Sequence, residues 1–369
     1  MSSTTLTAPA ATAHRSHGGA GSLTAVLALA LALLAPTQGT LRPTGDLLLG
    51  LAALASLRPQ ARLGWAGLQL LLVLAAAAVL SQTLPTPLQG GDGLRLLALL
   101  ALAQCSLQTL AALPDARWIG TATASLFGLW LLYFWEVGVT VFDVPRVLLP
   151  APSQVAVALW DNLGTLGGDF VQTVLKSVLI GYVLGNGLGV LTGIAIDRAP
   201  FLQRGLQPLA ALTSTVPLVG VAPIAVMWFG FDWPSKAAVI VLMTFFPALI
   251  NTLAGLEAAG KLERELMHSY AAGYRRTLLW LRLPTALPHI FGALKVNATL
   301  ALIGAIVAEF FGSPTAGLGF RISTEAARMN MPLVWGAIVL ASITGSVLYA
   351  LLSVLERRVN FWHPAFRSR

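Results

Sequence analysis

The chain has 369 residues, of which 56% are hydrophobic and 10% are charged, and its formal net charge is +8. Soluble domains usually carry about 25% charged residues, so this composition excludes an ordinary soluble protein and indicates a polytopic helical membrane protein. The positive charge does not indicate nucleic-acid binding, because the basic residues lie in short loops between apolar runs, as the positive-inside rule expects.

The first 117 residues are predicted to form a tail and an accessory membrane region. Residues 1–21 are small and polar, which predicts a disordered tail. The apolar run 22–34 fits either the core of a signal peptide or a first membrane span, and its long polar lead favours a retained span. Residues 22–117 therefore predict about four extra N-terminal spans, the last three at 45–57, 63–81 and 94–113.

The single cysteine of the chain, Cys105, lies within the apolar run 94–113. One thiol excludes a disulfide framework within one chain and a cysteine-based zinc site. No His-rich cluster in the sequence points to another metal centre. We therefore expect no metal ion, and we expect Cys105 to be a small buried or lipid-facing side chain.

Six further apolar runs predict a working unit that comprises residues 118–369. The boundary is placed near Asp115, because the loops beyond it are longer and richer in Pro, Gly, Trp and charge. With the N-terminus in the cytoplasm, ten spans place both chain ends and most loop arginines and lysines on the cytoplasmic side. The expected fold is all-α. The six runs are 118–140, 170–196, 205–230, 235–256, 285–311 and 333–355.

Four glycines spaced four residues apart lie in the run 170–196. Residues at this spacing share one face of a helix, and small residues let a neighbouring membrane helix approach closely. A dinucleotide-binding loop is the poorer interpretation, because the glycines lie within a span and follow no strand. The stripe predicts helix packing and consists of Gly181, Gly185, Gly189 and Gly193.

The segment "GLEAAGKL", Gly255 to Leu262, nearly satisfies the phosphate-binding pattern of ATPases. It has two glycines and Lys261, but Leu262 stands where Ser or Thr would bind magnesium. The segment also follows a membrane span instead of a strand. We expect a chance match, so that this chain does not itself bind ATP.

Residues 257–284 are too polar for a span and too long for a tight turn. Their apolar positions recur every three or four residues, which predicts one or two amphipathic helices, and Gly273 can bend or end the first of them. The segment is either a cytoplasmic loop along the membrane surface or a docking element for a soluble partner. The apolar positions are Leu262, Leu266, Tyr270, Tyr274, Leu278 and Leu281.

Three polar side chains lie deep within a predicted span, where such groups are costly in lipid. Lys295, Asn297 and Glu309 are candidates for a polar translocation path, or they satisfy polar groups between helices. Lys176 lies nearer the end of its run and can extend to the membrane surface. The sequence contains no paired-carboxylate motif of a membrane prenyltransferase and no Gly-x-Ser-x-Gly elbow, so nothing in it indicates catalysis.

The stretch from Glu265 to Pro284 resembles the cytoplasmic loop of ABC-importer permeases. That loop has the pattern Glu-Ala-Ala, three residues, Gly, nine residues, Ile, one residue, Leu-Pro. Aligned on Leu283 and Pro284, the Glu of the family falls on Glu265 and its Gly on Ala271, and Gly273 lies two positions later. The acid, the spacing and the Leu-Pro match, whereas the replaced glycine leaves open how the bend is built.

Three further segments resemble the nitrate, sulfonate and taurine type of permease, a group that includes pyrimidine-precursor and riboflavin transporters. They are "FWEVGVTVFDVPRVLLPAPSQV" from Phe134, "VPLVGVAPIAVMWFGFD" from Val216 and "AEFFGSPTAGLGFRI" from Ala308. The ending "ERRVNFWHPAFRSR" is more similar to the pyrimidine-precursor and riboflavin members. The resemblance covers about residues 118–369, and residues 1–117 lie outside it.

This resemblance implies a six-span permease core of the type I importer kind, paired as a homodimer in the bacterial cytoplasmic (inner) membrane and surrounded by lipid. It implies that the loop 257–284 couples the permease to cytoplasmic ABC ATPase subunits, which bind ATP and magnesium, while this chain holds no cofactor. A substrate-binding protein would deliver the solute outside. The docking residues expected from the alignment are Glu265, Ser269, Ala271, Ala272, Gly273, Arg275, Leu283 and Pro284.

The favoured hypothesis is therefore the permease subunit of an ABC importer for a small organic or anionic solute. Glu265 would suit an ionic or capping role, and the small residues Ala271 and Ala272 would permit close approach of the ATPase. Two alternatives stay open at this point. The chain could be a stand-alone secondary carrier with Lys295 and Glu309 as coupling groups, or a membrane scaffold whose loop binds another partner.

Overall fold

The computed structural model describes residues 42–56, 63–83, 92–113, 117–199, 201, 205, 218–312 and 315–362. The predicted tail and the first predicted span, at 22–34, lie outside the described residues, as does the first part of the run 205–230. Contacts divide the chain into two compact units, Met1–Ser153 and Gln154–Arg369. Each unit is described by itself.

The first unit contains the helices α2 (Arg42–Ser56), α3 (Leu63–Thr83), α4 (Asp92–Ala111) and α5 (Arg117–Val141). Leucines, alanines and Trp130 from these helices form its buried core. Arg95 of α4 is also buried, and its guanidinium pairs with Asp46 of α2 and with Asp92, in both cases at 2.7 Å. Because a buried charge is costly unless it is paired, the pair of Arg95 with Asp46 fixes α2 against α4, while Asp92 pairs with Arg95 within α4.

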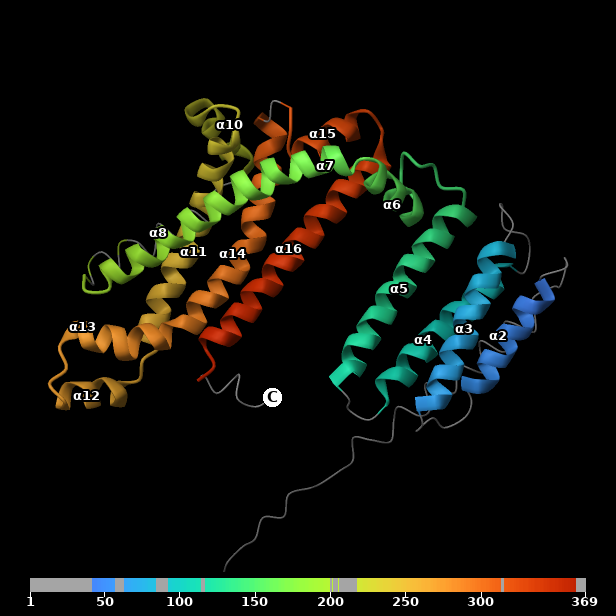
Figure 1. Ribbon diagram of the computed structural model, residues 1–369, viewed down its shortest axis with the longest axis horizontal. Helices are drawn as coiled ribbons and strands as arrows, with labels where there is room; N and C mark the ends of the chain where they lie inside the picture. Colours follow the sequence, from blue (N-terminus) through green and yellow to red (C-terminus); the bar gives the residue numbers. More distant parts are fainter. Residues whose placement is uncertain are drawn as a thin grey trace, which may run out of the picture. The chain divides into compact units, whose positions relative to one another are not determined.

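The second unit is built around α11 (Trp233–Glu257), which packs against α8 (Leu179–Ile196) on one side and α14 (Leu283–Gly312) on the other. Figure 1 shows α12 and α13 at one end of α14 and α15 at its opposite end. The remaining elements are α6 (Pro152–Asp161), α7 (Leu163–Phe170), a π-helical turn η1 (Val171–Val178), α10 (Leu218–Phe229), α12 (Lys261–Ser269), α13 (Tyr274–Thr277), a second π-helical turn η2 (Leu278–Arg282), α15 (Leu318–Ala327) and α16 (Met331–Val359).

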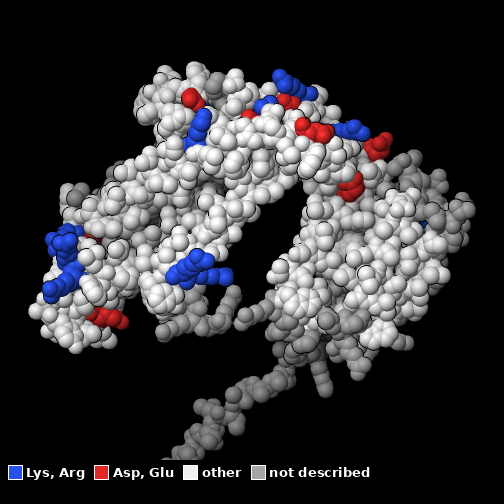
Figure 2. All heavy atoms as spheres, in the orientation of Figure 1, with Lys and Arg blue, Asp and Glu red and all other residues white. Residues whose placement is uncertain are grey.

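Among the described residues, seven helical stretches are long and apolar enough to cross a membrane. Of two shorter apolar helices, Thr44–Ser56 coincides with the predicted run 45–57, and Gly220–Phe229 lies in the last part of the predicted run 205–230. The described residues contain no strand, so the predicted all-α polytopic fold is confirmed. In the second unit, charged side chains gather toward the two ends of the membrane helices, and an uncharged band lies between them (Figure 2). The exact count of ten spans stays a prediction.

The predicted division near Asp115 does not coincide with the division into compact units. Helix α5, predicted to be the first span of the working unit, is grouped with the N-terminal helices, because the second unit begins at Gln154. Trp130 and Leu126 of α5 belong to the same buried core as α2, α3 and α4. Packing therefore links α5 to the accessory helices.

The start of α11 illustrates how a membrane helix is anchored at its end. The Asp232 carboxylate accepts hydrogen bonds from Gln172 Nε2 at 2.6 Å and from the Trp233 backbone N–H at 2.8 Å, and both favour the ionised form. They hold the pKa of Asp232 below its usual value. The neighbouring Lys236 is buried, and its ammonium donates to the backbone carbonyls of Phe231, Asp232 and Gly312.

Candidate functional site

The predicted loop 257–284 forms a helix, a turn and a second helix. Helix α12 begins after Gly260 and ends at Ser269, and α13 begins at Tyr274. Leu262, Leu266 and Tyr270 are spaced four residues apart, so they share one face of α12. Their exposed fractions are 78%, 56% and 77%. We name residues 257–284 the docking segment, and this apolar face is exposed along the whole of α12.

The turn after α12 is closed by backbone hydrogen bonds. The Ala272 N–H donates to the Met267 carbonyl at 3.0 Å, and the Ala271 N–H donates to the His268 carbonyl at 2.9 Å. This pair of bonds is the Schellman motif, whose residue after the cap adopts a left-handed conformation. Ala271 is that residue, with φ of 52°, whereas Gly273 has φ of −67°. The bend is therefore built at Ala271, the position that aligns with the glycine of the family pattern.

The docking residues expected from the sequence lie together on this segment. Glu265, Ser269, Ala271, Gly273 and Arg275 are exposed. Three others are half-buried, and they are Ala272 in the turn and Leu283 and Pro284 where α14 begins. No contact with a partner is present to test their roles, so docking stays a prediction.

Sequence reasoning missed Asp197, which directly follows α8. Its carboxylate accepts two hydrogen bonds from Arg282, from Nη1 at 2.6 Å and from Nη2 at 2.7 Å, and a third from Tyr274 Oη at 2.8 Å. The guanidinium carbon of Arg198 lies 3.5 Å from the centroid of the Tyr274 ring. Asp197 is the one acid in the loop after α8. Neighbouring residues gave no sign of its role, because its partners Tyr274 and Arg282 lie 77 and 85 residues further along the chain.

Both ends of the docking segment are held at the same place. Arg282 Nε donates to the Leu256 carbonyl at 3.0 Å, which joins the start of α14 to the end of α11. Arg264 Nη2 donates to the Glu257 carbonyl at 2.6 Å, which ties α12 to the same helix end. Arg282 thus contacts the ends of two membrane helices, α8 through Asp197 and α11 through Leu256.

The four glycines of the predicted stripe lie on α8 against α11. A Cβ atom added at Gly185 would lie 2.0 Å from Thr244 Oγ1, and one added at Gly189 would lie 2.5 Å from the Phe245 carbonyl oxygen. Gly181 and Gly193 face Ile240 and Thr252 at similarly short range. The absence of a side chain at these positions is therefore what brings the two backbones together.

Asn297 is fully buried between three helices. Its Nδ2 donates to Asn186 Oδ1 at 2.6 Å and to the Thr244 carbonyl at 2.9 Å, which links α14 to α8 and α11. Tyr182 Oη of α8 donates to the Leu294 carbonyl at 2.9 Å nearby. Asn297 Oδ1 has no hydrogen-bond partner among the described residues. The amide therefore holds helices together and keeps one free acceptor.

Glu309 connects the end of α14 to the start of α15. It accepts hydrogen bonds from Thr173 Oγ1 and from the Gly319 backbone N–H, each at 2.7 Å. Thr173 Oγ1 in turn accepts from the Leu318 N–H at 2.7 Å. Asp169 pairs with Arg321 at 2.8 Å next to this network. The role of Glu309 in translocation stays a prediction.

Lys295, the third candidate for the translocation path, pairs with Glu356 near the end of α16. The distance from Lys295 Nζ to Glu356 Oε2 is 2.7 Å, and the ammonium lies 5.9 Å from the centroid of the Tyr349 ring. Lys295 and Glu309 therefore have different partners and do not form a pair with each other. Lys176 is exposed, in agreement with a side chain that reaches the surface.

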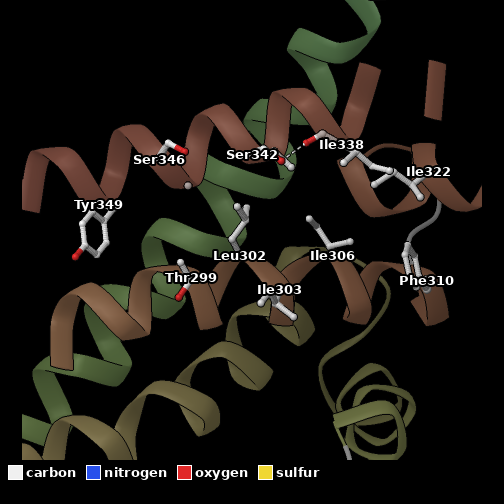
Figure 3. Close-up of a pocket in the computed structure, with 12 residues that line it drawn as sticks. Thr299, Leu302, Ile303, Ile306, Phe310, Ile322, Ile338, Ser342, Ser346 and Tyr349 are labelled. Atoms are coloured by element: carbon white, nitrogen blue, oxygen red, sulfur yellow. Dashed lines mark hydrogen bonds between the residues drawn. The ribbon is translucent and has the colours of Figure 1, made fainter. Parts of the chain in front are cut away.

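A groove of about 680 Å³ lies between α14, α15 and α16. Figure 3 shows Leu302, Ile303 and Ile306 of α14 facing Ser342 and Ser346 of α16 across it. Thr299 and Tyr349 add hydroxyl groups toward one end, and no charged residue lines it. Such a surface can contact an apolar or hydrogen-bonding molecule or another membrane helix.

The near match to a phosphate-binding loop has a packing explanation. A Cβ atom at Gly255 would lie 2.9 Å from Ala286 Cα, so this glycine lets α11 approach α14. Gly260 is the residue before α12, and Lys261 is the first residue of that helix. Among the described residues, no group of three His, Cys, Asp or Glu side chains could hold a metal ion.

Comparison with known proteins gives consistent matches. Residues 185–361 match the family described as "Binding-protein-dependent transport system inner membrane component". The formylaminopyrimidine transport permease protein ThiX of Halalkalibacterium halodurans is 32% identical over 238 residues, which are 64% of this chain and 94% of that protein. The riboflavin transport system permease protein RibX of Chloroflexus aurantiacus is 33% identical over 239 residues, which are 64% of this chain and 88% of that protein. The taurine transport system permease protein TauC of Escherichia coli is 27% identical over 63% of this chain and 86% of that protein.

Proposed function

The chain belongs to the family of binding-protein-dependent transport system inner membrane components, and from this premise we propose how it works. It is the transmembrane permease subunit of an ABC importer for a small organic or anionic solute, a multi-pass protein of the bacterial inner membrane. The relatives transport formylaminopyrimidine, riboflavin or taurine according to their names. The cargo of this chain is a member of the same broad class.

A cytoplasmic ATPase subunit docks on the docking segment. The observation that supports this most directly is the exposed apolar face of α12, Leu262, Leu266 and Tyr270, in a segment rich in charge. An apolar stripe on a short helix outside the membrane suits a groove on a soluble partner, as amphipathic helices in general do. ATP and magnesium are bound by that ATPase, and this chain contributes no ATPase site. A substrate-binding protein delivers the solute on the opposite side.

The permease works as a homodimer embedded in lipid. The groove between α14 and α16, together with the exposed face of α16, offers a membrane surface of the kind through which two copies could pack. Ile343, Val347 and Leu351 of α16 are exposed and apolar, so they face either lipid or a second copy. Mass measurement of the intact complex in detergent counts the copies.

Purification of the chain in mild detergent, with identification of what co-purifies, tests the function. We expect a soluble ABC ATPase, and we expect uptake in proteoliposomes only when that ATPase, a substrate-binding protein and ATP on the ATPase side of the membrane are supplied. Uptake driven by an ion gradient without any ATPase would show a secondary carrier instead. Co-purification of another protein without transport would show a scaffold.

A substitution in the turn tests the docking segment itself. Ala272 is half-buried beside the exposed Ala271 and Gly273, so Ala272→Trp should block close approach of the ATPase. We expect loss of coupled uptake while the protein stays in the membrane. Ala124→Trp is the matched control, because Ala124 is an exposed residue of α5, far along the chain from the docking segment. Unchanged uptake in the Ala272→Trp variant would contradict the docking role.

A further inference from the structure

Asp197 and Arg282 form a two-pronged ion pair at the base of the docking segment. Both carboxylate oxygens accept from the guanidinium, at 2.6 and 2.7 Å. The exposed fractions of the two side chains are 5% for Asp197 and 13% for Arg282. A bidentate pair fixes the direction as well as the distance between two side chains, and shielding from water strengthens it. The pair therefore sets the orientation of α8 relative to the start of α14.

Local helix electrostatics do not favour a carboxylate at this position. Asp197 lies at the C-terminal end of α8, where the helix dipole already carries partial negative charge. Removing a carboxylate from water is also unfavourable unless charged or hydrogen-bonding partners compensate. Arg282 and Tyr274 supply that compensation, and both come from the docking segment. Asp197 is thus stabilised at this helix end by the docking segment itself.

The contacts around this pair reach every helix that borders the docking segment. Tyr274 of α13 is held by Asp197 and by the Arg198 guanidinium above its ring. Arg282 also holds the end of α11 through the Leu256 carbonyl. A displacement of Tyr274 and Arg282 therefore either carries the ends of α8 and α11 along or breaks these contacts.

We propose that Asp197, Tyr274 and Arg282 form a clamp that transmits movement of the docking segment to the membrane helices α8, α11 and α14. They are positioning residues for coupled transport and do not contact the solute. The proposal rests on the proposed function, because it requires an ATPase that moves the docking segment. The clamp differs from the exposed face of α12, since its side chains bond to one another between the docking segment and the end of α8, and Asp197 and Arg282 are largely shielded from water.

The test uses the complete transporter in proteoliposomes, with solute uptake and ATP hydrolysis measured in the same vesicles. Asp197→Asn and Arg282→Gln remove the ion pair with little change of shape. We expect uptake per ATP hydrolysed to fall by roughly two- to thirty-fold, the range of coupling changes seen for residues between two sites. ATP hydrolysis and co-purification of the ATPase should persist, because the face of α12 is unchanged.

Two further variants separate transmission from simple structural weakening. The exchange Asp197→Arg with Arg282→Asp restores an ion pair but not the hydrogen bonds to Leu256 and Tyr274, so we expect it to recover part of the lost coupling. Tyr274→Phe removes one hydrogen bond and keeps the ring beneath Arg198, so it should fold normally and show a smaller loss. Arg358→Gln is the matched control, because Arg358 is an exposed arginine at the end of α16, outside the docking segment.

The outcomes distinguish this proposal from the proposed function. If the unaltered chain shows no ATP-dependent uptake, the proposed function fails and the clamp with it. The second case is that the unaltered chain does show ATP-dependent uptake. If Asp197→Asn and Arg282→Gln then have the same ratio of uptake to ATP hydrolysis as the unaltered chain, only the clamp is overturned. Equal losses of uptake and hydrolysis, without recovery in the exchanged pair, would also overturn it, since they indicate a structural role alone.

Discussion

A single backbone angle gives the docking segment its shape. Ala271 has φ of 52°, a conformation that costs an L-residue about 1–2 kcal/mol and costs glycine almost nothing. Ala271→Gly should therefore stabilise the turn by up to about 1 kcal/mol, part of the gain being lost to the greater freedom of glycine in the unfolded chain. Slower hydrogen exchange of the backbone amides in α12 and the turn would measure this.

The neighbouring glycine provides the control for that measurement. Gly273 has φ of −67°, which alanine adopts freely, and a Cβ atom there would meet nothing within 4 Å. Gly273→Ala should therefore be tolerated, and Ala271→Val should speed exchange because a β-branched residue fits the left-handed region poorly. Faster exchange in Ala271→Gly than in the unaltered protein would contradict this description of the turn.

Glu309 gives a second prediction at the scale of one residue. Glu309→Ala leaves both the Gly319 N–H and the Thr173 hydroxyl hydrogen without an acceptor. Each buried polar group left unsatisfied costs about 1–3 kcal/mol. The melting temperature of the purified protein should fall in Glu309→Ala and less in Glu309→Gln. A variant with reduced uptake and an unchanged melting temperature would instead place Glu309 on the translocation path.

Contacts between residues far apart in the chain are the part of the structure that could not be predicted from the sequence. Aligning a local pattern narrowed the bend to Ala271 or Gly273, because a turn depends on neighbouring residues, but it left open which of them builds it. Asp197 and Arg282 could not be paired in advance, because many charges in the chain compete for a partner until the helices are placed. The same reason hid the partners of Lys295 and Glu309, which lie on α16 and η1.

At the scale of helices, the approach of α8 to α11 depends on glycine. Gly185→Leu would drive a side chain into Thr244 and the α11 backbone, and overpacking of this kind costs about 1–3 kcal/mol or more. We expect a clear loss of folded protein, measured as the monodisperse fraction after detergent extraction. Gly187→Leu, two residues along the same helix, should be neutral, because nothing lies within 4 Å of a Cβ there. Similar losses in both variants would point to a general intolerance of α8.

The elements themselves were largely predictable because lipid imposes a simple rule on them. A membrane helix must satisfy its backbone internally and present an apolar surface, so runs of apolar residues mark most of the described spans. The four-residue spacing of the glycines placed them on one face of α8, because residues at this spacing lie above one another on a helix. The π-helical turns η1 and η2 were not foreseen, since no residue pattern announces them. Nor was the packing of α5 with α2, α3 and α4.

At the scale of the molecule, the docking segment and the loop around α15 lie at opposite ends of α14 (Figure 1). The topology expected from the charge distribution then places Arg276 in the cytoplasm and Arg328 outside. Both residues are exposed, and the native Cys105 is buried. A membrane-impermeant maleimide should label Arg328→Cys in intact cells and Arg276→Cys only after permeabilisation. Labelling of both in intact cells would overturn this topology.

The contact between Arg282 and the Leu256 carbonyl closes the docking segment at its base, so that its two ends are neighbours. A segment closed in this way is a separate unit that begins and ends at the same place on the membrane helices. Its tip can change sequence, length or partner preference without shifting the register of the membrane helices that carry it. Exchange of such segments between related permeases should succeed when Arg282 and Tyr274 travel with them and meet an acid at the end of α8, as Asp197 is here. It gives evolution a route to new ATPase partners that leaves the solute pathway untouched.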